Sequence, residues 1–300
     1  LSVPAIEGII REKMGYEGVI ITDGLGMEGV TKYHKPGELE VEAIRAGNDI
    51  LLLPEDVPAA ALKLLEYLHS GPEENARIAE SVKRILGMKY DLGITEPQHV
   101  EEVNVRANIN SPASFALRRK LIRNAFTLVR NEGAILPIRR LDTVTMASLS
   151  IGTSKKTPFQ NQLEEYAAMD HFQTGKEVGA DRRRQLLNNL GGKDLVFISL
   201  HDLSSYASKD YGISRSAREF INDLRKITKV VLVHFGNPYA LKFFDEVDCV
   251  LGAYEEDKDF QELAAQALFG AMPITGQLPI TASDKAVFAQ GERTSDLYRF

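Results

Sequence analysis

The sequence predicts an α/β protein in two parts joined by a linker. Short apolar runs alternate with amphipathic stretches over most of its 300 residues, and this alternation is typical of parallel strands connected by helices. The run Val19-Ile20-Ile21 contains no polar residue, as expected of a strand buried on both faces. Residues 93–110 show neither helical nor strand periodicity and contain Pro97, so we predict that they form the linker.

The first part, residues 1–92, is predicted to alternate helices and strands. Apolar residues at helical spacing indicate an amphipathic helix that Gly15 ends. Pro54 closes a second apolar run, and Pro72 opens the last helix at its first turn. The predicted elements are a helix at 1–14, a strand at 19–21, a helix at 38–46, a strand at 49–53, and helices near 57–70 and 73–87.

The second part, residues 111–285, is predicted to be a doubly wound parallel sheet with helices on both faces. Ser111-Pro112 is typical of a helix start, and this first helix is expected to reach Ala125. The predicted strands are 127–129, 144–149, 195–200, 230–235 and 249–254. The predicted helices are 158–168, 180–190, 214–226, 238–245 and 258–269. Residues 286–300 are predicted to be an exit tail.

Composition excludes several classes of function. A net charge of −6 provides no basic surface for nucleic acid or an anionic membrane. Cys249 is the single cysteine, which rules out an internal disulfide and fits a buried strand residue. The six histidines lack metal-ligand spacing. No metal or cofactor is expected, no stretch is long enough to span a bilayer, and neither a signal peptide nor another feature indicates the compartment.

Asp23 is the first candidate for chemistry, because it ends the first strand and ligands bind at that end of parallel strands. Three interpretations compete. Gly24-x-Gly26-x-x-Gly29 matches a dinucleotide fingerprint, with Glu55 or Asp56 as the ribose acid. Pro36, however, interrupts the helix that such a site needs. Alternatively, Asp23 caps a short helix. The third interpretation is a catalytic carboxylate.

Five strings in order resemble glycoside hydrolase family 3. GYEGVIITDGLGMEGV resembles the family's nucleophile segment, particularly in its N-acetyl-β-glucosaminidase branch, and Asp23 matches the nucleophile. AIRAGNDILLLPED resembles the eighth barrel strand and its flanks. VLVHFGNPYAL, VLGAYEED and ALFGAMPITGQLPI resemble the family's second domain. The resemblance implies that residues 1–92 form the last quarter of a (β/α)₈ TIM barrel, followed by an α/β sandwich domain.

A complete barrel needs about 250 residues, so six strands would be missing from the first part. Exposing the four apolar residues 50–53 would forfeit about 1.5–3 kcal/mol per side chain, against a typical domain stability of about 5–15 kcal/mol. We therefore predict that residues 1–92 are not independently stable as a barrel. They should pair with an N-terminal part of the same polypeptide, dimerise through open strand edges, or rearrange.

The resemblance also implies a retaining mechanism, with Asp23 as nucleophile and a second group as acid and base. In the N-acetylglucosaminidase branch that group lies on a loop with a Lys-His-Phe-Pro-Gly-type motif, which is absent here. In the β-glucosidase branch it is a Glu of the second domain, which we cannot align. The implied substrate is an oligosaccharide with terminal N-acetylglucosamine, and the fragment alone is expected to be inactive. A noncatalytic α/β interaction or regulatory module remains the alternative.

Three further residues are weak candidates for substrate contact. Met27 follows Asp23 in the resembling string, and Tyr206 and Asp210 lie on the polar loop 201–212 after a predicted strand. An ordinary solvated loop is the competing interpretation. His201 and Asp202 invite an acid and base role, but neighbouring residues at a strand end point to opposite sides.

Overall fold

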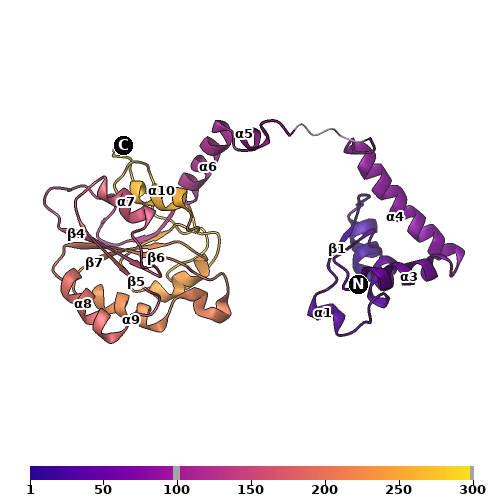
Figure 1. Cartoon of the computed structure of the whole chain (residues 1–300), viewed down its shortest axis with the longest axis horizontal. Coiled ribbons are helices and arrows are strands. Elements are labelled where there is room, and N and C mark those ends of the chain that lie inside the picture. Colours follow the sequence, from indigo (N-terminus) through magenta and orange to yellow (C-terminus); the bar gives the residue numbers. More distant parts are fainter. Residues whose placement is uncertain (97–101, 298–300) are drawn as a thin grey trace. The chain divides into compact units, whose positions relative to one another are not determined.

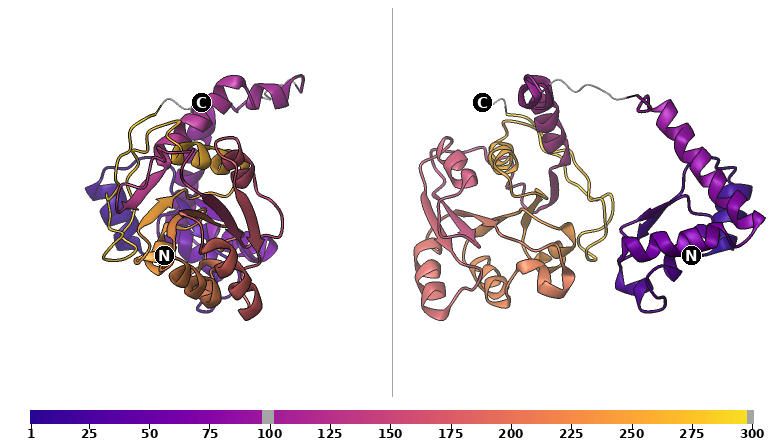
Figure 2. Two further views of the ribbon diagram at one scale, coloured as in Figure 1. Left: turned by 90° about the vertical axis from the view of Figure 1, so that its left-hand side faces the viewer. Right: turned by 45° about the vertical axis from the view of Figure 1, so that its right-hand side comes forward.

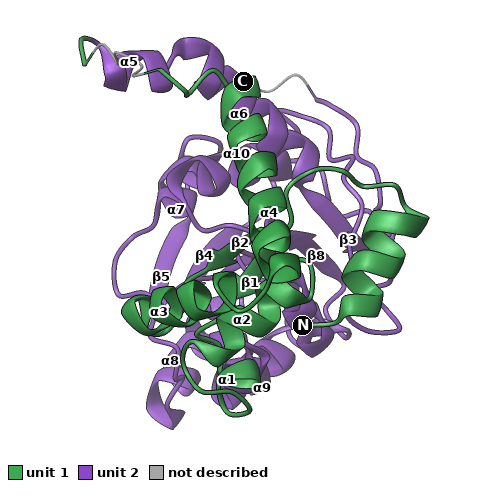
Figure 3. Cartoon of the chain, turned by 90° about the vertical axis from the view of Figure 1, so that its right-hand side faces the viewer, with its two compact units in different colours: residues 1–103 green, residues 104–300 purple. Residues whose placement is uncertain are grey.

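The computed structural model describes residues 1–96 and 102–297. It divides into two compact units, residues 1–103 and 104–300 (Figure 3), and each is described by itself. Within the stretch predicted to be a linker, Val105–Ile109 forms helix α5. Pro97, on which that prediction partly depended, lies outside the described residues.

Unit 1 contains the predicted order of helices and strands, with a two-stranded parallel sheet at its centre. Strands β1 and β2 pair with Ile21 opposite Ile50 and Gly24 opposite Leu52. The first helix is wound as a π-helix, and none of its residues is buried. The elements are η1 Pro4–Lys13, β1 Ile21–Gly24, α1 Glu28–Thr31, α2 Glu38–Arg45, β2 Ile50–Leu52, α3 Val57–Leu68 and α4 Pro72–Asp91.

The prediction that both strands of unit 1 are buried on two faces is wrong for this structure. Val19 and Ile20 are half-buried and precede β1, while the Ile21 side chain is 52% exposed. In the second run, Leu52 and Leu53 are 43% and 71% exposed. Among the described residues each strand pairs only with the other in this sheet, and these side chains remain exposed to solvent.

The Asp49 side chain links several segments of unit 1 through hydrogen bonds. Its fully buried carboxylate accepts hydrogen bonds from Arg11 Nη2 at 2.7 Å, the Ile20 N–H at 3.0 Å, Ser81 Oγ at 2.7 Å and Arg84 Nη1 at 3.1 Å. These donors lie on η1, on the approach to β1 and on α4. A single side chain therefore joins parts of unit 1 that are 29 to 38 residues away in sequence.

Unit 2 is an α/β sandwich with a six-stranded sheet in the order β3-β8-β7-β6-β4-β5. All neighbouring strands are parallel except β3, which runs antiparallel to β8. The strands are β3 Thr127–Asn131, β4 Met146–Ile151, β5 Asp170–Thr174, β6 Leu195–Leu200, β7 Lys229–His234 and β8 Cys249–Gly252. The helices are α6 Pro112–Ala125, α7 Pro158–Glu164, α8 Ala180–Leu190, η2 Ala207–Gly212, α9 Arg215–Leu224, η3 Pro238–Phe244 and α10 Lys258–Leu268.

Helices cover both faces of this sheet (Figure 1 and Figure 2). One buried cluster packs α8, α9 and η3 against the sheet, for example through Leu186 and Phe220. The other packs α6, α7 and α10, for example through Phe159 and Leu263. The predicted α/β class with a parallel sheet is confirmed. The prediction missed β5 and the antiparallel direction of β3.

The C-terminal residues remain attached to unit 2. Ala286 N–H donates to Ser283, Glu292 N–H donates to the carbonyl of Leu128 in β3, and Leu297 N–H donates to that of Gly270. Residues 286–297, assigned to an exit tail from the sequence, thus contribute hydrogen bonds to the domain, and 298–300 lie outside the described residues.

Gly152→Ala is expected to destabilise unit 2 by about 2 kcal/mol or more. Gly152 follows β4 with φ +101°, and a Cβ atom there would collide with the carbonyl of His201. The matched control is Gly175→Ala, because a Cβ atom there meets nothing within 4 Å. Thermal denaturation of both variants, followed by far-UV circular dichroism, checks the difference. Equal melting temperatures would contradict it.

Candidate active site

Asp23 lies at the carboxyl edge of the two parallel strands of unit 1. It is the third residue of β1, so the strand continues past the position predicted from the sequence, and its side chain is exposed. The N–H groups of Leu25 and Gly26 donate to the carbonyls of Leu52 and Leu53 at 2.9 and 3.0 Å. These bonds hold the turn after β1 against the end of β2, so Asp23 is presented from a hydrogen-bonded strand pair.

The Asp23 carboxylate accepts a hydrogen bond from the neighbouring Gly24 N–H at 2.7 Å. It does not cap a helix: the cap residue of α1 is Met27, and α1 has no side-chain cap bond. The capping interpretation is therefore wrong. The donor to Asp23 is thus a backbone N–H of the glycine turn that follows it.

The dinucleotide interpretation is wrong as well. The helix after Gly29 that would face a pyrophosphate is only the four-residue α1, Glu28–Thr31. Asp56, one of the two candidate ribose acids, instead caps α3, since its carboxylate accepts the Ala59 N–H at 2.9 Å.

The weak substrate-binding candidates fall in different units. Met27 follows the same turn as Asp23, is 50% exposed, and its N–H donates to the Gly24 carbonyl at 3.4 Å. Tyr206 and Asp210 belong to unit 2, at the start of η2 and within it. Tyr206 is 66% exposed, whereas the Asp210 carboxylate is paired with Arg218 at 2.9 Å.

A second carboxylate of interest, Glu256, was missed by the sequence analysis. His201 is buried at the end of β6, with Nδ1 3.1 Å from Glu256 Oε1 and Nε2 2.8 Å from Ser199 Oγ. The Asp202 N–H donates to Glu256 Oε2 at 2.6 Å. Glu256 lies in the string VLGAYEED, but its partners lie 54 and 55 residues upstream, and no local pattern links them.

Two other reactive side chains of unit 2 are buried in the core. His234 is enclosed at the end of β7, and burial lowers its pKa to about 4, although its hydrogen bond to the Asn237 carbonyl opposes the shift. Burial likewise raises the pKa of the Cys249 thiol in β8. Neither is available for chemistry. Within residues 1–96 and 102–297, no cluster of His, Cys, Asp and Glu could hold a metal ion, and no helix is long and apolar enough to cross a membrane.

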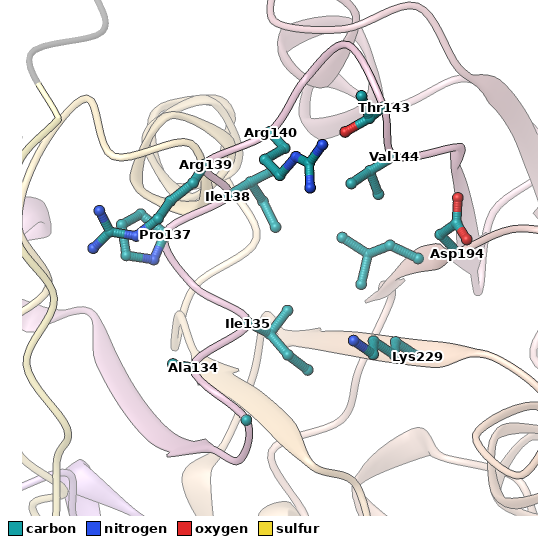
Figure 4. A pocket seen from close by; sticks show the side chains of 12 residues that line it. Ala134, Ile135, Pro137, Ile138, Arg139, Arg140, Thr143, Val144, Asp194 and Lys229 are labelled. Carbon is teal, nitrogen blue, oxygen red and sulfur yellow. The ribbon is translucent and has the colours of Figure 1, made fainter.

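One pocket of unit 2, of about 500 Å³, lies where β6 and β7 begin (Figure 4). Arg140, Asp194 and Lys229 line it together with apolar side chains such as Ile135 and Val144. It is at the amino ends of the parallel strands, opposite to the edge where such sheets bind ligands. The Asp194 carboxylate is already bonded to the N–H and hydroxyl of Thr145, so we assign no chemistry to this pocket.

Comparison with known proteins identifies the first unit. Residues 1–88 match the family model described as the glycosyl hydrolase family 3 N terminal domain. The chain is 23% identical over 92% of its length to a putative β-xylosidase of Formosa agariphila, and 22% identical over 92% to a β-N-acetylglucosaminidase/β-glucosidase of Cellulomonas fimi. It spans 40% and 51% of these two relatives.

Solved structures of glycosidases share the fold. A glycoside hydrolase family 3 β-N-acetylglucosaminidase from Paenibacillus sp. aligns with a TM-score of 0.72 at 23% identity, over 94% of this chain and 54% of that one. A β-glucosidase from Listeria innocua aligns with a TM-score of 0.73 at 18% identity, over 93% and 42%. The family recognised in the sequence strings is thus confirmed by the family model and by the curated relatives. The similarity to glycoside hydrolase family 3 thus includes a family-model match over residues 1–88 and relatives that align with 92% of the chain.

Proposed function

We propose that this chain supplies the C-terminal quarter of the barrel and the second domain of a retaining β-N-acetylhexosaminidase, with Asp23 as the nucleophile. The observation that carries the proposal is an exposed carboxylate at the carboxyl edge of two parallel strands, bonded to a backbone donor and not used as a helix cap. Barrel enzymes place their catalytic groups at this edge.

The chemistry follows from an oriented carboxylate. Asp23 attacks the anomeric carbon and forms a glycosyl-enzyme while a second group protonates the leaving oxygen. Water, activated by that second group, then releases the sugar. The Gly24 N–H fixes one oxygen of Asp23 and leaves the other for attack. The acid and base group is proposed to lie in the N-terminal part of the same polypeptide.

Two alternatives have support of their own. The curated relatives include enzymes named as a β-xylosidase and a β-glucosidase, so a β-glucosidase-type substrate is the second candidate. A noncatalytic α/β module is the third, and it fits the six-stranded sheet of unit 2, which has helices packed on both faces. Hydrolysis of aryl glycosides by a form that carries all eight barrel strands separates them: turnover of the N-acetylglucosaminide supports the first, turnover of the glucoside the second, and neither the third.

The 300-residue chain alone is expected to show no turnover of an aryl N-acetyl-β-glucosaminide. General acid and base catalysis contributes about 10² to 10⁴ in rate, and the Lys-His-Phe-Pro-Gly-type motif that would supply it does not occur in the sequence. The measurement is release of the aryl alcohol by the purified chain. Turnover that Asp23→Asn removes would contradict the proposed division of the site.

Unit 1 is also expected to self-associate or to bind the missing barrel strands. Apolar side chains of α3 and α4 are exposed, among them Leu65 and Leu86, and a groove of about 680 Å³ runs along α4, lined by Ile78, Val82 and Tyr90. Such patches are rare on stable monomers. Sedimentation of the chain tests this expectation, and a compact monomer at high concentration would contradict it.

The nucleophile is tested most directly by trapping. A 2-deoxy-2-fluoro glycosyl donor, incubated with the form that carries the whole barrel, is expected to leave a covalent sugar on the peptide that contains Asp23, as read by mass spectrometry. Label on any other residue would refute the assignment.

A further inference from the structure

A second cavity of unit 2 lies at the carboxyl ends of β6, β7 and β8, the edge where parallel sheets bind ligands. Its volume is about 510 Å³, within the range of small-molecule sites. The side chains that line it include Ser205, Asn237, Tyr239, Tyr254 and Glu256. Among the described residues that line it are two carboxylates, Glu255 and Glu256, but neither lysine nor arginine.

Glu256 is held in one orientation from inside the sheet. His201 contacts one carboxylate oxygen and the Asp202 N–H the other, while the Glu256 side chain remains 40% exposed. A carboxylate has about four acceptor positions. Two are used by the protein, so two are left to accept hydrogen bonds from a ligand.

One arrangement of protons satisfies the whole network. If His201 donates through Nδ1 to Glu256, its Nε2 accepts from the Ser199 hydroxyl. Ser199 in turn accepts from Ser150 at 2.9 Å, and Ser150 from Thr157 at 3.3 Å. Every donor then has an acceptor, which fixes the histidine tautomer and makes the carboxylate an acceptor only.

The trio Ser199, His201 and Glu256 has the connectivity of a hydrolase triad but not its accessibility. Ser199 is fully buried, and its oxygen is shared with Ser150. A nucleophile must reach its substrate, and this one cannot. His201 therefore acts as a positioning residue, and Glu256 is the member of the trio that a ligand can contact.

The walls of the cavity are fixed in advance. Thr127 donates its hydroxyl hydrogen to the Ala125 carbonyl, so the Tyr254 hydroxyl must donate to Thr127 across 2.6 Å. The Asn237 amide donates to the Ser205 carbonyl at 3.2 Å and accepts the Tyr239 N–H at 3.0 Å. Tyr239 itself is 45% exposed. Preformed walls lower the entropy cost of binding a small ligand.

We propose that this cavity binds an uncharged, polyhydroxylated ring such as a pyranoside, with two neighbouring hydroxyls donating to Glu256 and the ring lying against tyrosine. The carboxylates and the absence of a lining cation oppose an anionic ligand. The exposed Tyr239 ring offers an apolar face with a polar tip. The site belongs to unit 2 and does not depend on Asp23.

The test uses the ¹⁵N-labelled 300-residue chain titrated with methyl β-D-glucopyranoside and with N-acetyl-D-glucosamine. Saturable shifts of the Asp202 amide and the Asn237 side-chain amide are expected, with dissociation constants in the millimolar range. Glu256→Gln is expected to weaken binding about tenfold or more, because hydrogen bonds to an ionised carboxylate are stronger than those to a neutral amide. Tyr239→Ala, at an exposed position, should weaken it independently.

The controls separate this site from the proposed nucleophile. Glu262 lies on α10, and its carboxylate is paired with Lys258. Glu262→Gln should leave binding unchanged, and so should Asp23→Asn. Loss of binding in Asp23→Asn would place the sugar at the other site and overturn the inference. Absence of saturable shifts with either sugar, or shifts with methylammonium chloride in place of the sugars, would also overturn it.

Discussion

Asp23→Asn is expected to lower kcat/KM for an aryl N-acetyl-β-glucosaminide by about 10³-fold or more in the form of the protein that carries the whole barrel. The amide cannot form the glycosyl-enzyme, so the two-step route is closed. Because Asp23 is exposed and its carboxylate is bonded to the N–H of the adjacent Gly24, the substitution should leave the fold unchanged. Initial rates, with circular dichroism to verify folding, provide the measurement.

The matched control is Asp56→Asn. Asp56 follows strand β2, which pairs with β1. Asp56 caps α3, and asparagine is an equally good cap, so this variant removes one negative charge from the same edge without loss of structure. We expect its kcat/KM to stay within a few-fold of wild type. Asp23→Gly, which removes the whole side chain, provides a positive test. With azide it should yield the glycosyl azide of inverted configuration, because azide attacks the anomeric carbon from the face that the carboxylate no longer occupies. Equal losses in Asp23→Asn and Asp56→Asn would indicate a general charge effect and contradict the nucleophile assignment.

The sequence predicted the second sheet best where strands are buried on both faces. The run Leu195–Leu200 was predicted with its observed bounds, because an apolar segment broken only by Ser199 is typical of a central parallel strand. Strand β5, Asp170–Thr174, was missed since it is an edge strand of mixed polarity, half-exposed along most of its length. The direction of β3 depends on its pairing with β8, about 120 residues away, which no local pattern records.

The candidate site divides in the same way. Asp23 could be singled out as a candidate because it lies among local features, a strand end and a glycine turn. Glu256 and Asp49 could not, since each acquires its role from partners far away in sequence. The Asp49 carboxylate pairs with Arg11 on η1 and with Arg84 on α4. From the sequence alone, arginines at these helix positions would be expected to face solvent. The burial predicted for Ile21 failed for a related reason, because hydropathy reports what a side chain requires and not whether a neighbour is present to cover it.

Asp49→Asn is expected to reduce the stability of unit 1 by about 3–5 kcal/mol. The carboxylate is fully buried and lies 2.7 Å from Arg11 and 3.1 Å from Arg84. An amide leaves these guanidinium groups without a counter-charge and places an N–H₂ group against donors. Hydrogen exchange of the amides in β1 and β2 measures the opening free energy where the effect should be felt. Glu42→Gln, which breaks the exposed pair with Arg45, should change it by less than about 0.5 kcal/mol.

The same variant carries a pH signature. Burial alone would raise the pKa of Asp49, but hydrogen bonds from Ser81, the Ile20 N–H and Arg84 outweigh burial and lower the pKa below its ordinary value. A carboxyl whose pKa is lower in the folded state binds fewer protons there, so its stabilisation is complete above about pH 4 and disappears as the pH falls through the folded pKa. The stability difference between wild type and Asp49→Asn should therefore be constant near neutral pH and shrink in acid. A difference that persists unchanged at pH 2 would show that lost packing, and not the ionised carboxylate, separates the two proteins.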